Sequence, residues 1–420
     1  MSKIISYKKI TGDFIVFSVF LLVFFYDSLN KYLGFYDELL ALLSFITILY
    51  ISLIKKKIRI YKQEKYILYF LLLILIIGLL SNYHSYKYSY FTAKQAIIGD
   101  LISFFKAFVV YFGLRLLSEK IDSKKIIDNL IKYSEVIFYL LFLILIVDIL
   151  FHIFPQYHRF GLTSYQLFFT HTSRFGFAFA FLFLLLFPRY FNKKNLFLIF
   201  VLSIGVLSLR VKYFGFFILS ILFIYYGKFL FRIPKKTFLI VFGIILFIVA
   251  LIFKDQFEMY FNLNRLETGW SRAVILYYSF KIGNDFFPFG TGFGTYASFF
   301  SGKYYSWVYE LYGIDNVYGI SKQYWEFVSD QFWPMLLGQF GYIGLISFAG
   351  IIYNYFMLFL KQIKEYSIMD SYRFVPFLGL ILLLIDSSSD AIFTQNRAVV
   401  MFLVFSLFVN IQKSFNVQNQ

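Results

Sequence analysis

A pair of basic residues, Arg210 and Lys212, stands between two long apolar runs of this sequence. A charged group in such a position is costly in hydrocarbon, so it either lines a cavity as an anion ligand or reaches the phosphates of lipid headgroups. Arg159 and His171 frame a second polar segment, HRFGLTSYQLFFTHTSRFGF (158–177). The positions of these basic residues predict a phosphate-binding site. His171 is expected either within that site or as a polar cap at the membrane interface.

Two further arginines, Arg265 and Arg272, lie seven residues apart in NRLETGWSRAVILYYSF (264–280). Seven residues are about two helical turns, so both side chains would share one face of a helix. A guanidinium group matches phosphate oxygens with two parallel hydrogen bonds, whereas lysine offers a point charge. The segment therefore predicts either an anion-binding helix or an amphipathic helix that rests on lipid headgroups.

Three glycines, Gly290, Gly292 and Gly294, alternate in the stretch FPFGTGFGTYASFF (287–300). Their spacing does not fit the dinucleotide-binding fingerprint, and no Gly-Lys-Ser/Thr ending marks a phosphate-binding loop of the nucleotide triphosphatases. Glycine still allows close approach of the backbone and leaves N–H groups able to face an anion. The motif predicts either contact with a phosphate or a tight turn where the chain re-enters a helix.

A carboxylate, Asp330, comes just before the apolar run of SDQFWPMLLGQFGYIG (329–344). At this position it would either cap a helix N-terminus or act as a general base. Asp148, Asp386 and Asp390 are further candidates, and the last two could line the same cavity. The His and acidic residues lack metal-binding spacings such as HExxH, so neither a metal site nor a cofactor is expected.

The elements that must position these residues are membrane helices. Of the 420 residues 60% are hydrophobic, and runs such as TFLIVFGIILFIVALIF (237–253) are long enough to cross a hydrocarbon layer of about 30 Å. The pattern predicts an all-α polytopic integral membrane protein with about twelve transmembrane helices. Their approximate ranges are 14–30, 37–54, 66–81, 97–114, 134–153, 172–188, 195–210, 213–227, 237–253, 334–360, 374–388 and 397–411.

Basic residues mark one side of the predicted membrane. Most of the 40 Lys and Arg fall in every second segment between the apolar runs, such as KKKIRIYKQEK (55–65) and GKFLFRIPKK (227–236). By the positive-inside rule these segments are cytoplasmic, which places both termini in the cytoplasm and the candidate site on the outer face. The net charge of +17 then reflects topology and contact with membrane lipids, and no nucleic-acid partner is expected.

One connection is far longer than the others and is expected to be a large extracytoplasmic loop. It carries all four Trp residues of the chain and mixes charges of both signs, so short helices packed on the membrane domain are expected. Three regions follow: a membrane domain with the first nine transmembrane helices (1–253), the large loop (254–333), and the last three transmembrane helices with a cytoplasmic C-terminus (334–420).

Three motifs together resemble those of bacterial O-antigen polymerases and ligases. The first is an arginine after a mid-chain span (LSLR, 207–210). The second is an arginine-containing helix (NRLETGWSR, 264–272) ahead of PFGTGFGTY (288–296). The third is a polar residue before a Gly-x-x-Gly pair (SDQFWPMLLGQFGYIG, 329–344). The match covers mainly residues 155–345, and the chain is most similar to Wzy-type capsular and exopolysaccharide polymerases.

The resemblance implies a metal-independent membrane glycosyltransferase that polymerises lipid-linked oligosaccharide repeat units. In such proteins arginines engage the pyrophosphate of an undecaprenyl-linked glycan. By motif this role falls to Arg210 and to Arg265 or Arg272, with Arg159 as a further candidate. The related ligases place a histidine where this chain has Asp330, so the general base stays open between Asp330 and a histidine such as His171.

The resemblance also implies the cellular location, the substrates and the partners of the protein. It predicts a multi-pass protein of the bacterial cytoplasmic (inner) membrane whose substrates are undecaprenyl pyrophosphate-linked glycans. A chain-length regulator and a flippase of the same pathway are implied partners. Two alternatives stay open: a flippase for lipid-linked oligosaccharides with a similar number of spans, and a ligase-like transferase that uses another acceptor.

Overall fold

The chain is all-α apart from one short hairpin within the residues that the computed structural model describes, which are 2–54, 60–117, 121–230, 237, 240, 243–244, 269–365 and 371–418. The hairpin pairs β1 (Tyr157–Arg159) with β2 (Leu162–Ser164) in antiparallel orientation. The helices are α1 (Ser2–Phe20), the π-helical η1 (Leu21–Phe25), α2 (Tyr26–Leu33), α3 (Tyr36–Ile54), α4 (Lys62–Lys87), α5 (Lys94–Leu116), α6 (Ser123–Phe151), α7 (Thr172–Tyr190), α8 (Asn195–Val206), α9 (Val211–Leu230), α12 (Ser271–Asp285), α13 (Phe299–Lys303), α14 (Trp307–Leu311), α15 (Phe332–Glu365), the 3-10 helix η4 (Ser371–Arg373), α16 (Phe374–Asp386), the 3-10 helix η5 (Ile392–Thr394) and α17 (Asn396–Gln418).

The predicted apolar ranges agree with these helices. Eleven of the twelve overlap described helices, and most of the remaining one, 237–253, lies outside the described residues; the number of twelve membrane crossings stays a prediction. Seven described helices are long and apolar enough to cross a membrane: Ile10–Leu29, Lys31–Ile54, Lys62–Lys87, Lys94–Leu116, Ser123–Phe151, Thr172–Tyr190 and Phe332–Lys361. The described chain thus has the helix lengths and composition of a membrane protein.

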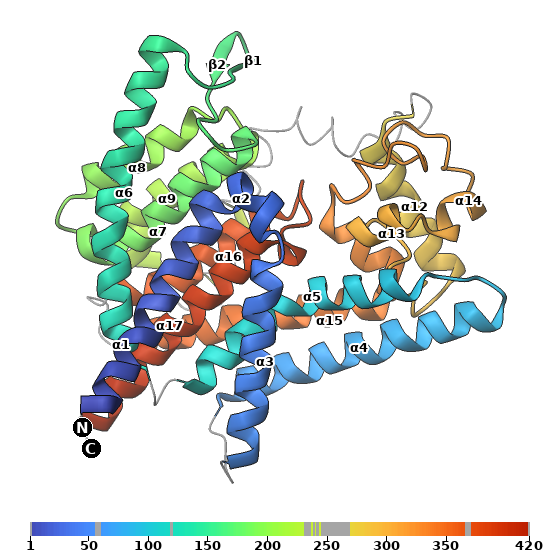
Figure 1. Ribbon diagram of the computed structural model, residues 1–420, viewed down its shortest axis with the longest axis horizontal. Coiled ribbons are helices and arrows are strands. Elements are labelled where there is room, and N and C mark those ends of the chain that lie inside the picture. The colour runs from blue at the N-terminus through green and yellow to red at the C-terminus, as the bar shows by residue number, and fades with distance from the viewer. Residues whose placement is uncertain are drawn as a thin grey trace.

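Two groups of helices form the molecule (Figure 1). In one, α4, α5 and α15 run side by side, with α12, α13 and α14 stacked on them. In the other, α1 and α6 to α9 surround α16 and α17, and α17 also packs on α5 and so connects the groups. Residues 269–331, which lie within the segment predicted as a large loop, contain α12, α13 and α14 joined by turns; the placement of this segment outside the membrane stays a prediction.

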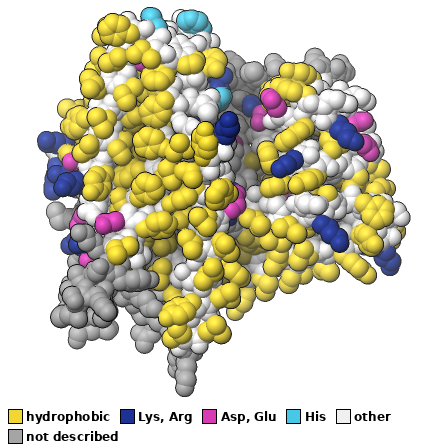
Figure 2. Space-filling model, viewed as in Figure 1, with side chains coloured by type: hydrophobic (Ala, Val, Ile, Leu, Met, Phe, Trp, Pro, Cys, Tyr) yellow, Lys and Arg dark blue, Asp and Glu magenta, His cyan; other side chains and the backbone are white. Residues whose placement is uncertain are grey.

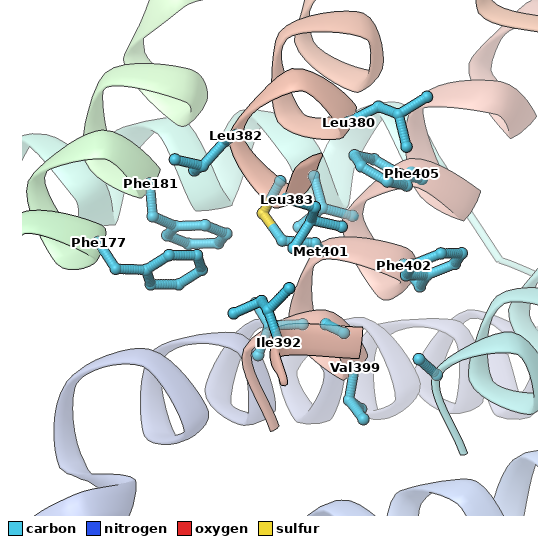
Figure 3. Close-up of a cluster of buried hydrophobic side chains, with 14 of the residues drawn as sticks. Phe177, Phe181, Leu380, Leu382, Leu383, Ile392, Val399, Met401, Phe402 and Phe405 are labelled. Carbon is cyan, nitrogen blue, oxygen red and sulfur yellow. The ribbon is translucent and has the colours of Figure 1, made fainter. Parts of the chain in front are cut away.

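The core of the second group is built from aromatic and aliphatic side chains of three helices (Figure 3). Phe177 and Phe181 of α7 face Leu382 and Leu383 of α16, and Met401 of α17 lies between them. All five side chains are buried. Because apolar packing fixes these three helices against one another, the polar ends of α7, α16 and α17 are held in a constant relation.

The helix α15 is interrupted at Gly341, whose φ of 61° is not helical. The interruption frees backbone carbonyls of the preceding turn, and the glycine stretch supplies their donors. Thr291 N donates to Gly338 O at 3.0 Å, and Gly292 N donates to Gln339 O at 2.8 Å. A broken helix inside an apolar bundle needs such partners, since an unpaired backbone group would cost several kcal/mol there.

The three alternating glycines are positions of close packing. Each has a positive φ, 74° at Gly290, 99° at Gly292 and 72° at Gly294, and each is buried. A Cβ at Gly290 would lie 2.6 Å from the backbone N of Gly341, and one at Gly294 would lie 2.7 Å from the backbone carbon of Ala96. The glycines therefore let the loop enter between α4, α5 and α15.

We predict that Gly290→Ala destabilises the protein far more than Gly313→Ala. Both glycines have a positive φ, but a Cβ at Gly313 would meet nothing within 4 Å. Gly313→Ala should therefore lower the free energy of unfolding only by the strain of a left-handed backbone, about 1 kcal/mol. Gly290→Ala adds overpacking and should lower the free energy of unfolding by about 3 kcal/mol. Melting temperatures of the purified variants in detergent check this expectation. Equal losses would show that the loop does not pack against α15 as described.

Candidate functional site

Charged side chains gather where the two groups of helices meet. Hydrophobic side chains cover most of the face in Figure 2; some Lys, Arg, Asp, Glu and His side chains lie along the boundary between the α6–α9 side and the α12–α14 side, and others lie at the left edge, at the top and on the right of the view. The segments that contribute there are the start of α7, the start of α9, the start of α12, residues 386–397, and Asp330, which lies two residues before α15. They are far apart in the sequence, so the fold brings them together.

Arg210 is held by the residues that begin α7. Its Nε donates to Thr172 Oγ1 at 2.6 Å, and its terminal nitrogen lies 2.6 Å from Nε2 of His171. His171 directly precedes α7, and its Nδ1 lies 2.7 Å from Ser173 Oγ. Since a guanidinium only donates, Nε2 must accept, and the proton of the neutral ring belongs on Nδ1, where it faces Ser173.

This arrangement makes His171 a poor general base. The pKa of His171 is lowered to about 4. The causes are partial desolvation of the ring and the positive charges of Arg210 and Lys212, whereas the charge of Asp390 acts in the opposite direction. Because His171 is exposed to solvent, burial contributes less to the lower pKa than the charges of Arg210 and Lys212, which fix the direction of the shift. With its one lone pair already occupied by Arg210, His171 acts as a support for that arginine.

Lys212 belongs to a balanced ion cluster, formed with Asp386, Asp390 and Arg397. Its ammonium lies 2.8 Å from Asp386 Oδ1 and 3.7 Å from Asp390 Oδ2. The guanidinium of Arg397 is 3.0 Å from Asp386 Oδ2 and also binds Asp390. Burial alone would raise the pKa of Asp390, but Arg397 and then Lys212 outweigh it and hold the pKa well below its usual range. The charge of Lys212 is directed inward to these carboxylates.

Asp330 and Arg272 form a charged pair at the same boundary. Arg272 donates from Nε at 3.0 Å and from a terminal nitrogen at 2.8 Å, both to Oδ2 of Asp330. No other described residue donates to this carboxylate, so Oδ1 is available to a ligand. Burial raises the pKa of Asp330, and Arg272 offsets the rise only in part. Asp330 therefore combines increased basicity with an open oxygen.

A cavity of about 660 Å³ opens beside this pair. It is lined by Gly269, Trp270, Ser271, Arg272, Tyr318, Phe327 and Asp330. The volume lies within the range of about 300–1,000 Å³ that is typical of small-molecule sites. A bound molecule would meet a carboxylate, a guanidinium and several aromatic faces at once.

The Arg272–Asp330 pair and the ion cluster are neighbours. The charges of Asp390 and Lys212 both act on Asp330. Trp333, in the first turn of α15, donates from Nε1 to Ser387 Oγ at 3.1 Å and so ties the start of α15 to the segment that carries the ion cluster. Arg210, the ion cluster and the Arg272–Asp330 pair therefore belong to one polar region of the described chain.

Other predicted site residues lie elsewhere or have other partners. Arg159 is exposed on β1, although its charge still acts on His171. Arg265 lies outside the described residues. The backbone N–H groups of Gly290, Gly292 and Gly294 donate to Phe286 O, Gln339 O and Asp100 Oδ2, respectively. Because protein acceptors occupy these three groups, the structure favours the tight-turn interpretation over phosphate contact.

Two arginines of the region, one buried and one partly buried, were not predicted from the sequence. Arg397 has only 3% of its side chain exposed, and Arg174 lies 3.4 Å from Asp27 and donates to Asn396 Oδ1 at 3.1 Å. The missed signal was the one that singled out Arg210, namely a basic residue at the predicted outer end of an apolar run, against the positive-inside bias.

The arrangement can bind an anion and accept a proton at adjacent places. Arg210 presents a guanidinium on a support made by α7, and Asp330 presents a basic oxygen beside a cavity. Within the described ranges, no group of three or more His, Asp or Glu side chains is placed to hold a metal ion. The chain matches no known family model, no curated protein and no solved structure.

We predict that acid destabilises the protein partly through His171. Its pKa is about 6.5 in an unfolded chain and about 4 in the folded protein, so the unfolded state takes up the proton first as the pH falls. The stability contributed by the neutral ring is complete above pH 6.5 and is lost between pH 6.5 and 4. The melting temperature of wild type should therefore fall more than that of His171→Gln between pH 7 and pH 5.

Between pH 8 and pH 7 the same two proteins should keep a constant difference in melting temperature, because the ring is neutral in both folded and unfolded chains. A parallel decline of wild type and His171→Gln down to pH 5 would contradict the placement of His171 beside Arg210.

Proposed function

We propose that this protein polymerises lipid-linked oligosaccharide repeat units at the outer face of a bacterial cytoplasmic membrane. The reaction would transfer a growing glycan from undecaprenyl pyrophosphate to the sugar of an undecaprenyl pyrophosphate-linked repeat unit. One observation carries the proposal. Arg210 and the Arg272–Asp330 pair, from motifs more than a hundred residues apart at their extremes, meet in one polar region of an otherwise apolar helical protein.

The position of this region supports an outer-face site. The ion cluster lies at the start of α17, and the C-terminus lies at the other end of the same 23-residue helix. Such a helix is about 35 Å long, close to the thickness of a hydrocarbon layer. The N-terminus lies beside the C-terminus (Figure 1). If both termini are cytoplasmic, as the basic segments indicate, the polar region faces the other side. This is the topology that twelve spans and an outer loop would produce.

The chemistry needs a cation for the leaving group and a base for the acceptor. Undecaprenyl pyrophosphate leaves with its bonding electron pair and gains negative charge, which guanidinium groups stabilise best where water is scarce. Arg210 suits this role because Thr172 and His171 fix its guanidinium in place. Lys212 contributes to the local field, but Asp386 takes up its ammonium directly.

Asp330 suits the role of general base. Its Oδ1 would accept the proton of the acceptor hydroxyl while the hydroxyl oxygen attacks the anomeric carbon of the donor. The new C–O bond forms as the bond between that carbon and the pyrophosphate oxygen breaks. Arg272 holds Oδ2 and thereby orients Oδ1 toward the cavity side. The same geometry would serve a ligase-like transferase, so the acceptor distinguishes the two reactions.

We predict that Asp330→Asn stops chain elongation. Loss of a general base should lower the rate by about 100-fold or more, because the asparagine cannot take up the proton. Cells that carry the variant should hold inserted protein but accumulate single repeat units on their outer side, measured by polysaccharide size analysis. Glu310→Gln, an exposed carboxylate of α14, is the matched control and should leave chain length unchanged.

The side on which repeat units accumulate also separates the alternatives. Full-length polymer in Asp330→Asn cells would remove Asp330 from the mechanism. Repeat units trapped on the cytoplasmic side in a deletion strain would point to a lost flippase and would contradict the proposed polymerase.

A second prediction concerns the cation. Arg210→Ala should lower polymer formation by about 100-fold or more, comparable to the loss of an oxyanion donor, and Arg210→Lys should recover only part of it because lysine cannot bind Thr172 and His171 in the same geometry. Lys322→Ala, at an exposed lysine of the same outer segment, serves as control. Normal polymer length in Arg210→Ala cells would exclude Arg210 as a pyrophosphate ligand.

A further inference from the structure

The cavity beside Asp330 is lined by two chemically different sets of side chains, called here the polar wall and the aromatic wall. One consists of Arg272 and Asp330, joined by two hydrogen bonds. The other consists of the aromatic side chains Trp270, Tyr318 and Phe327. A ligand that fills the cavity must therefore offer an apolar face to one wall and hydrogen-bonding groups to the other.

The aromatic wall is preformed. The ring centroids of Tyr318 and Phe327 are 5.9 Å apart, and Tyr324 packs on Tyr318 at 4.8 Å. Phe327 N donates to Gly319 O at 3.1 Å. Gly319 has a φ of 83°, and a Cβ there would collide with the Phe327 ring. Because the turn at Gly319 is needed to seat Phe327, the backbone itself fixes the position of the aromatic faces.

We infer that this cavity is a saccharide subsite, in which Tyr318 and Trp270 stack on the C–H face of a sugar ring while its hydroxyl groups meet Asp330 and Arg272. A pyranose has the required two-sided chemistry, with axial C–H bonds on one face and hydroxyls around its edge. A lipid tail would leave Oδ1 of Asp330 without a hydrogen-bond donor, and a bare phosphate would leave the aromatic wall unused and face the charge of Asp330.

The assignment of this sugar as the acceptor rests on the proposed function. Asp330 is the group in the cavity that can take a proton, and the acceptor is the substrate that loses one. The donor pyrophosphate then lies toward Arg210, on the other side of the ion cluster. Acceptor sugar and donor phosphate would thus occupy opposite ends of one polar region, with the anomeric carbon between them.

The test measures binding of a sugar that carries neither lipid nor phosphate. The probe is the free oligosaccharide repeat unit released by mild acid from the cell's own surface polymer, titrated into purified full-length protein and followed by saturation-transfer NMR. Wild type should bind it. Tyr318→Ala should weaken binding by about tenfold, whereas Tyr318→Phe keeps the ring face and should stay within about twofold of wild type.

Tyr304→Ala is the matched control, because Tyr304 is another exposed tyrosine of the same segment and does not line the cavity. It should bind the probe as wild type does. Absence of binding to wild type, or an equal loss in Tyr304→Ala and Tyr318→Ala, would overturn the saccharide subsite. A normal polymer in cells with non-binding Tyr318→Ala protein would remove the acceptor role. Binding that depends on Tyr318 in a protein that makes no polymer would instead refute the proposed polymerase and leave the sugar site standing.

Discussion

The guanidinium of Arg397 is almost completely removed from solvent, in the first turn of a helix whose dipole already disfavours a cation. A charge in that position must be neutralised where it lies, and Asp386 and Asp390 do so. Those carboxylates in turn draw in Lys212, which begins α9 two residues after Arg210. The need to balance one buried charge thus brings together the ends of α9, α16 and α17, and it places Arg210 and Asp330 on either side of the cluster.

The break in α15 also requires compensation, because the backbone carbonyls before Gly341 need hydrogen-bond donors from elsewhere. The interruption at Gly341 is possible because the loop of alternating glycines donates hydrogen bonds to the carbonyls before it, while Ser81 and Asn82 of α4 bind the same loop from the other side. The first turn of α15 is then tied through Trp333 to Ser387 of the segment that carries the ion cluster, and Asp330 lies two residues before the helix. The glycine loop acts on the site by fixing where α15 begins.

The helices, and several of the residues that meet at the polar region, could be predicted from the sequence. Apolar runs predict helices well because burial in hydrocarbon leaves the backbone few other choices, and basic residues on the unexpected side of such runs pointed to Arg210 and Lys212. The partners of these residues could not be predicted in the same way. Whether Lys212 faces a ligand or Asp386 depends on how three helices pack. The glycine motif is ambiguous for a related reason, since close approach to a phosphate and close approach to another helix both require a residue without a side chain.

The structure also separates two candidates for the base that the sequence left equal. Both are polar residues next to a helix N-terminus, but one has its lone pair covered by a guanidinium and the other has an oxygen open to a cavity. The proposed polymerisation is tested most directly with the purified protein in liposomes that contain an undecaprenyl pyrophosphate-linked repeat unit and no other protein. The account predicts lipid-linked dimers and longer products together with an equal yield of released undecaprenyl pyrophosphate per bond formed, and none of these with Asp330→Asn. Unchanged substrate that only crosses the bilayer would contradict it.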